Sequence, residues 1–154
     1  MEYYFLKIKQ ITTNKKDFID LLLLADEEER MIDKYLERGD VFALYAKNSV
    51  RSICVVTCEK NGVYEIKNMA TEPSSQRMGY ASYLIEYISS FYRRKNTQSI
   101  IVGTGYGTST VDFYKKCGFR ESHIVKNFFT DNYINPIVED GVHLVDMIYL
   151  KKEL

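Results

Sequence analysis

Polar and apolar positions follow two different periods along the first 71 residues, and the two periods predict different elements. Residues 4–11 alternate at every second position, which is typical of a half-buried strand. Residues 18–39 have apolar positions at helical spacing and end at Gly39, which predicts one or two helices. Three stretches rich in β-branched and aromatic residues follow, with Asn-Ser and Asn-Gly as turn signals. They predict an antiparallel meander with strands at residues 41–47, 51–60 and 63–71.

The second part of the chain alternates between helical and strand patterns. Residues 79–94 predict a helix whose apolar face consists of Tyr80, Leu84, Tyr87, Ile88 and Phe91. The short apolar run at residues 99–105 predicts a buried strand, and residues 108–119 predict a second helix that stops at Gly118. Together with the strands on either side, these elements predict a β-helix-β-helix-β unit.

Two further strands are expected near the end of the chain, at residues 120–129 and 143–152. The segment between them, residues 129–141, is the only long irregular stretch in the pattern. Long loops in compact domains often line functional sites, so we expect this segment to lie near one.

Length and charge limit the protein to a few classes. The chain has 154 residues, which fits a single domain over residues 1–154. Lys plus Arg and Asp plus Glu both total 21, so the formal net charge is zero. A balanced charge gives no general attraction to nucleic acid or to an anionic membrane, and we expect neither as a partner. A charged ligand would therefore have to bind through charged or polar groups at its own site.

No segment of the chain reads as a targeting or membrane sequence. The apolar run at residues 21–25 is too short to span a bilayer, and residues 1–10 alternate instead of forming a signal peptide. Cys54, Cys58 and Cys117 are an odd set and lack the second pair that a structural zinc site needs. We therefore expect three reduced thiols, no metal and a cytoplasmic protein.

A polar loop that contains glycine runs directly into the helix predicted at residues 79–94. The loop and helix start read Gln-Arg-Met-Gly-Tyr-Ala-Ser over residues 76–82. A helix N-terminus exposes N–H groups without intrahelical partners and the positive end of the helix dipole, which suits an anion. Short glycine motifs also occur by chance, and an ordinary loop that joins an ordinary helix explains this one equally well.

Three segments, in order, resemble the acetyl-CoA-binding core of the GNAT N-acetyltransferase superfamily over roughly residues 60–125. They read EIKNMATEPSSQRMGYASYLIEYI, SIIVGTG and TVDFYKKCGF. The family's loop has Gln or Arg, then Gly three residues later and Gly or Ala two residues after that, and Gln76, Gly79 and Ala81 match it. The family's Phe-Tyr pair ahead of a Gly-Phe pair is matched at residues 113–114 and 118–119. Each motif is weak alone, and together they are fairly specific.

The resemblance implies an α/β (α+β) fold, in which a mixed, mostly antiparallel sheet of about seven strands is flanked by about four helices. It implies an N-acetyltransferase that uses acetyl-CoA as co-substrate and transfers the acetyl group directly, in a ternary complex. The acceptor would be a primary amine of a small molecule or a protein, and the enzyme would be a monomer or homodimer. Two alternatives remain open here: a non-catalytic acyl-CoA-binding sensor or interaction module, and a nucleotide-binding module with the same glycine loop.

The resemblance assigns the cofactor contacts to three places. Backbone groups ahead of Pro73 would bond to the pantetheine arm as an added strand does, and they belong to Met69, Ala70 and Thr71. The loop and helix start would hold the pyrophosphate, through Gln76, Arg77, Met78, Gly79, Tyr80, Ala81 and Ser82. Thr108 stands where many members have an asparagine that reaches the pantetheine, and Val111 stands where alanine is usual. A plain strand that ends at proline and a solvated Arg77 are the structural alternatives.

The resemblance also supplies two catalytic candidates. An alkylamine with a pKa of about 10.4 is mostly protonated at pH 7, so a proton acceptor is useful. Glu65 precedes Gln76 by eleven residues, the spacing of a base glutamate in some members, although a solvent-facing strand glutamate is the alternative. Tyr114 has the position of the family's acid, which would protonate the leaving thiolate, although a packing role is the alternative. Glu72 and Asp112 are weaker candidates for the base.

Polar residues in the late irregular segment are candidates for substrate selection. Asp131, Tyr133, Glu139 and Asp140 could attract a cationic amine, and an exposed acidic loop without a ligand is an equally good interpretation.

Overall fold

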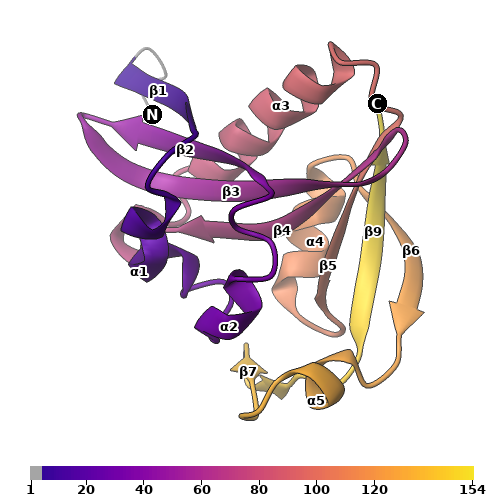
Figure 1. The fold of residues 1–154 in the computed structure, drawn as a ribbon. Helices are drawn as coiled ribbons and strands as arrows, with labels where there is room; N and C mark the ends of the chain where they lie inside the picture. Colours follow the sequence, from indigo (N-terminus) through magenta and orange to yellow (C-terminus); the bar gives the residue numbers. More distant parts are fainter. Residues whose placement is uncertain (1–4) are drawn as a thin grey trace.

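A computed structural model describes residues 5–154 (Figure 1). The expected first strand began at Tyr4, which lies outside the described residues together with residues 1–3. The strands are β1 (Leu6–Ile11), β2 (Asp40–Ala46), β3 (Ser49–Lys60), β4 (Val63–Thr71), β5 (Ser99–Gly105), β6 (Arg120–Val125), β7 (Val138–Glu139), β8 (Val142–His143) and β9 (Met147–Glu153). The helices are α1 (Ile19–Leu22), α2 (Glu29–Ile32), α3 (Tyr80–Arg93), α4 (Ser109–Lys116) and α5 (Phe128–Asn132), with 3-10 turns η2 (Lys15–Phe18) and η3 (Pro73–Ser75).

The main sheet has seven strands in the order β1-β2-β3-β4-β5-β9-β6. All neighbours in it are antiparallel except β4 and β5, which are parallel and joined through α3. In Figure 1, β2 and β3 run across the view while β5, β9 and β6 run down it, so the twist of the sheet turns its two halves apart. The expected mixed, mostly antiparallel sheet is confirmed, and so is the β-helix-β-helix-β unit.

Short turns set the register of the N-terminal meander. Lys47 and Asn48 both have positive φ, 52° and 66°, which is the backbone of the two-residue hairpin turn that matches strand twist. Gly62, with φ 79°, closes the next hairpin at the Asn-Gly signal. Both turns lie where the sequence predicts them.

Helices cover both faces of the sheet. Phe42 and Leu44 of β2 point to the face that α3 covers, where Leu84 and Ile88 complete one buried cluster. Val41 of the same strand points to the opposite face and joins a second cluster with the α1–α2 segment. Because successive side chains of a strand point to opposite faces, β2 contributes to both buried clusters. None of the helices in residues 5–154 is long and apolar enough to cross a membrane.

Helices lie where the sequence predicts them, and the structure refines their lengths and buried faces. Residues 18–39 contain two one-turn helices, α1 and α2, separated by a break at residues 26–28, where the backbone of Glu28 is extended. The side chain of Asp26 is buried there and accepts a hydrogen bond from Tyr35 (2.9 Å), which holds the chain out of a continuous helix. On α3, Tyr87 is 37 % exposed and Ile85 is buried, so the buried face is rotated slightly from the expected one.

The two C-terminal strands are shorter than predicted. The strand expected over residues 120–129 ends at Val125, because Asn127 has φ 58° and donates its N–H to Asp146 Oδ1 (2.9 Å), after which α5 begins. The strand expected from His143 starts at Met147. His143 pairs instead with Val138 in a small hairpin, β7–β8, so the segment expected to be irregular contains a helix and a hairpin.

Candidate active site

An opening between β4 and β5 lies at the centre of the sheet. Their parallel pairing runs from Val63 opposite Ser99 to Ile66 opposite Val102 and ends there, although β4 continues to Thr71. The pairing of β4 with β3 also shifts register at this point, so that Lys67 is a bulge residue between Ile66 and Asn68. The edge of β4 that faces β5 therefore has no ladder partner after Ile66.

Two cavities meet along this opening; the larger lies beside α3 and α4, and the smaller also reaches Leu24 and Ala25, which follow α1. The smaller one, of about 380 Å³, is lined by Met69, Ala70 and Thr71 of β4 and by Val102 and Thr104 of β5, among others. The larger one, of about 800 Å³, extends from the same part of β4 to the start of α3. We call them together the α3–α4 cleft. Met69, Thr71, Gln76, Ser109, Thr110, Tyr114 and Asp140 line both cavities.

The start of α3 presents free backbone donors to this cleft. Arg77 and Gly79 have φ of 63° and 84°, and this loop leads into α3 without a side-chain cap on Gly79. The first intrahelical bond runs from the N–H of Tyr83 to the carbonyl of Gly79 (3.0 Å). The N–H groups of the residues from Tyr80 to Ser82 therefore have no partner within the helix, which is the arrangement that binds anions.

Most of the expected loop residues line the α3–α4 cleft, and one does not. Gln76, Arg77, Gly79, Tyr80, Ala81 and Ser82 line its larger cavity. Met78 is 48 % exposed and lines a separate pocket beside Phe5 and Ala46. Glu72, a weaker candidate for the base, accepts hydrogen bonds from the N–H of Ser74 (3.1 Å) and the hydroxyl of Ser75 (2.8 Å), so it caps the turn η3.

Tyr114 lies on α4 where the two cavities of the cleft meet. Its ring packs against Phe113 and Phe119, with centroids 5.1 and 5.4 Å away, and the residue is 6 % exposed. Its hydroxyl has no hydrogen-bond partner within residues 5–154. Burial raises the pKa of Tyr114 well above its ordinary value, so the hydroxyl keeps its proton at neutral pH.

Glu65 lies on the opposite face of the sheet. It is 7 % exposed, so the alternative of a solvent-facing strand glutamate is wrong. Its Oε2 accepts a hydrogen bond from the Tyr149 hydroxyl (3.1 Å) and lies 3.2 Å from Nζ of Lys67. Burial raises the pKa of Glu65, and the neighbouring Lys67 ammonium opposes that shift without cancelling it.

A third cavity, of about 290 Å³, contains Glu65 and lies between α2 and α5. We call it the α2–α5 pocket. It shares Ile66, Lys67 and Gly103 with the smaller cavity of the α3–α4 cleft. Two compartments therefore meet at the opening between β4 and β5, with Tyr114 on one side and Glu65 on the other.

Three hydroxyl residues, Thr108, Ser109 and Thr110, lie at the start of α4. Thr108 is 5 % exposed, and its Oγ1 donates to the carbonyl of Gly105 (2.9 Å) and lies 2.7 Å from Oγ1 of Thr110. Its side chain is thus engaged inside the protein, and a cofactor contact for it stays a prediction. Ser109 and Thr110 line the α3–α4 cleft, and their place near the predicted start of the second helix is the available sequence signal.

The hairpin β7–β8 reaches over the cleft from the late segment. Asp140 at its tip accepts hydrogen bonds from the N–H (2.9 Å) and the hydroxyl (2.8 Å) of Ser109, so it caps α4. Glu139 lines the smaller cavity, and burial raises its pKa. Of the other candidates in this segment, Tyr133 donates to Asp26 (2.7 Å), whereas Asp131 is exposed and lines none of the three cavities.

Within residues 5–154 no group of three or more His, Cys, Asp or Glu side chains could hold a metal ion. The side-chain amide of Asn68 donates to the Leu22 carbonyl (3.0 Å) and the Tyr35 hydroxyl (3.1 Å). Asn68 thereby joins β4, just after the bulge, to the α1–α2 segment, and sequence reasoning missed this contact.

Known proteins resemble this chain in both sequence and fold. A family model described as an acetyltransferase (GNAT) domain matches residues 37–121. The chain is 31 % identical, over 97 % of both chains, to the uncharacterized N-acetyltransferase YvbK of Bacillus subtilis (strain 168). A GNAT family acetyltransferase from Elizabethkingia anophelis with acetyl-CoA bound superposes with a TM-score of 0.92 at 35 % identity, over 97 % of this chain and 99 % of that one. A Bacillus subtilis acetyltransferase in complex with CoA gives 0.90 at 31 % identity with the same coverage.

Proposed function

The chain belongs to the GNAT acetyltransferase family and is an acetyl-CoA-dependent N-acetyltransferase, and we propose that it transfers the acetyl group directly to a primary amine in a ternary complex. The observation that carries this proposal is the meeting of two compartments at the opening between β4 and β5. Direct transfer requires both substrates to be bound at once with their reacting atoms adjacent. A cleft and a pocket that share wall residues satisfy that requirement.

The α3–α4 cleft suits coenzyme A along its whole length. The free N–H groups at the start of α3 would hold the pyrophosphate, with Gly79 and Ala81 leaving room for its approach. The unpaired edge of β4 at Met69, Ala70 and Thr71 would bond to the amide groups of the pantetheine arm. In this arrangement the thioester end would point toward Tyr114, which lines both cavities of the cleft.

Glu65 and Tyr114 have raised pKa values, which suit a base and an acid for the two proton transfers. The amine nitrogen forms a bond to the thioester carbon, the carbon–sulfur bond breaks, and the products are an N-acetyl amide and coenzyme A. Glu65, directly or through a water, would take the proton that the amine loses. Tyr114, which keeps its proton because its pKa is raised, would give it to the leaving thiolate.

Two measurements test the proposal. Calorimetric titration with acetyl-CoA should show one site per chain, and a panel of amines should release free thiol only when an acceptor is present. Lack of acetyl-CoA binding at high micromolar concentration would refute the cofactor site. Thiol release that does not depend on an amine would refute the transfer of the acetyl group to an amine acceptor.

We also assign residues 1–154 to one transferase domain in the cytoplasm, as a monomer or homodimer. The support for the compartment is that all three cysteines, Cys54, Cys58 and Cys117, are free thiols.

A further inference from the structure

We infer that the acceptor is a small monoamine with an aromatic ring and that it binds in the α2–α5 pocket. The inference rests on the proposed function and adds the class of amine. It is drawn from the side chains that line the pocket, from the charges among them and from the contacts that close one end of it.

Aromatic and methionine side chains form much of the pocket wall. Six of them line the pocket together with Glu65: Met31, Tyr35, Phe128, Tyr133, Met147 and Tyr149. Flat rings and thioethers favour a flat apolar ligand through ring contacts and sulfur–aromatic contacts. The volume of about 290 Å³ lies at the lower end of small-molecule sites, so a single ring system with a short amine arm is the appropriate size.

The amine end is fixed by the place of Glu65. Among the lining residues, Ile66, Lys67 and Gly103 also line the α3–α4 cleft, so this end of the pocket adjoins the cofactor side. Glu65 directly precedes Ile66 on β4, at the same end. A ligand that orients its nitrogen toward Glu65 therefore places its ring among the aromatic residues farther out.

Charges in the pocket disfavour acceptors with several ammonium groups. Both of its carboxylates are engaged within the protein: Asp26 accepts from Tyr35 (2.9 Å) and Tyr133 (2.7 Å), and Glu65 lies between Tyr149 and Lys67. Three basic side chains also line the pocket, those of Lys34, Arg38 and Lys67. A second ammonium group would meet like charges without a free carboxylate to pair with, which is unfavourable.

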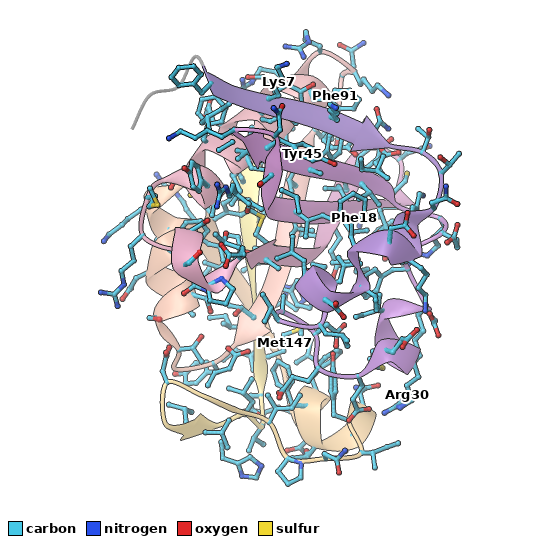
Figure 2. The ribbon with its side chains drawn as sticks, turned by 90° about the vertical axis from the view of Figure 1, so that its left-hand side faces the viewer. Lys7, Phe18, Arg30, Tyr45, Phe91 and Met147 are labelled. Carbon is cyan, nitrogen blue, oxygen red and sulfur yellow. The ribbon has the colours of Figure 1, made fainter. Side chains whose placement is uncertain are left out.

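Hydrogen bonds across one end of the pocket disfavour a peptide. Arg30 Nη2 donates to the Asn132 carbonyl (2.6 Å), and Figure 2 shows Arg30 close to α5. The N–H groups of Ile134 and Asn135 donate to Glu28 Oε2 (3.0 and 3.2 Å). With the Tyr133–Asp26 bond, these contacts tie the α1–α2 segment to the α5 segment. An extended peptide that crossed here would have to break several of them.

The first test compares acceptor classes at saturating acetyl-CoA. The probes are 2-phenylethylamine, tyramine and tryptamine, against spermidine and a short peptide with a free N-terminus, with thiol release as the readout. We expect kcat/KM to be at least about tenfold higher for the arylalkylamines, which corresponds to one well-packed ring. Equal or better turnover of spermidine or the peptide would overturn this inference and leave the proposed function intact. No turnover with any amine would overturn both.

A pair of variants then locates the binding site. Phe128→Ala should raise KM for 2-phenylethylamine roughly tenfold, because a lining ring is lost, with little change in the Kd of acetyl-CoA. Tyr106→Ala removes a ring that is 54 % exposed and lines none of the three cavities, so both constants should stay within about twofold. Unchanged KM in a Phe128→Ala protein that still binds acetyl-CoA would overturn the assignment of the pocket.

Discussion

The α3–α4 cleft and the α2–α5 pocket meet at one opening in the sheet, yet they are built from different parts of the chain. The cleft depends mainly on backbone: a strand edge without a partner, two left-handed residues and the free N–H groups of α3. The pocket depends on side chains from α2, β4, β9 and α5, joined by contacts such as that between Asp26 and Tyr133. A backbone site can persist while side chains vary, whereas a side-chain site can change its ligand by substitution. The difference suits a constant cofactor and a variable acceptor.

Removal of the Tyr114 hydroxyl should have the largest effect on activity. It should slow the chemical step without weakening the binding of acetyl-CoA. Tyr114→Phe keeps the ring between Phe113 and Phe119, so the fold and the Kd of acetyl-CoA should hardly change. Loss of a general acid should lower kcat by roughly 100-fold or more. Steady-state kinetics beside calorimetry measures the two effects. Equal turnover in the variant would remove Tyr114 from the mechanism and leave the cleft as a binding site only.

Glu65→Gln tests the same step from the acceptor side. We expect kcat to fall roughly tenfold to 100-fold, with acetyl-CoA binding retained. A base acts only when it is deprotonated, so wild-type activity should be lost as the pH falls through the pKa of Glu65. Because burial raises that pKa, the loss should begin at a higher pH than for an ordinary glutamate. The variant should lack this limb of the pH profile, and an identical profile in both proteins would assign the base elsewhere.

Two glycines with nearly the same φ allow an effect on acetyl-CoA binding to be distinguished from an effect on folding stability. Gly79 and Gly107 have φ of 84° and 88°, so alanine at either position should lower the free energy of unfolding by about 1 kcal/mol. Gly79 lines the cleft and Gly107 does not. Gly79→Ala should therefore raise the Kd of acetyl-CoA roughly tenfold, because a Cβ and a shifted loop disturb the anion site, whereas Gly107→Ala should not. Calorimetry and thermal unfolding of both variants distinguish these outcomes, and a matching loss of affinity in both would argue against a local effect.

The smallest effect is expected at the edge of the acceptor side. Tyr133→Phe removes one of the two hydroxyls that donate to Asp26 and leaves the ring in the pocket. Loss of one such hydrogen bond costs about 1 kcal/mol of the free energy of unfolding. Because the bond also orders the pocket wall, KM for the amine should rise by at most about fivefold while the Kd of acetyl-CoA stays constant. A change in acetyl-CoA affinity instead would show that the two compartments are coupled more tightly than their construction suggests.

The two compartments also differ in how far the sequence predicts them. Gln76, Gly79 and Ala81 are close neighbours in the chain, and the strand before them and the helix after them have clear hydrophobic periods. The local sequence is therefore sufficient to predict this strand–loop–helix segment. The pocket depends on pairs such as Asp26 with Tyr133, which are 107 residues apart, and no local pattern encodes their contact.

Local preferences that lost to tertiary contacts explain the remaining differences. Phe128 and Phe129 favour a strand by propensity, yet the backbone turns at Asn127, whose N–H donates to Asp146 Oδ1, and both residues enter a helix. The cofactor contact of Thr108 stays a prediction; its hydroxyl donates to the carbonyl of Gly105, a local contact three residues away. Ser109 and Thr110 line the cleft without matching any motif.

The gap between β4 and β5 also has a consequence for amide hydrogen exchange. Central strands normally exchange slowest, because their N–H groups are paired on both edges of the strand. Here the amides of β4 after Ile66 that face β5 have no ladder partner, in the middle of a seven-stranded sheet. They should therefore exchange faster than the amides of the paired half of the same strand. Added coenzyme A should slow exchange in residues 67–71 selectively, which would report docking of the pantetheine arm without an assay of turnover.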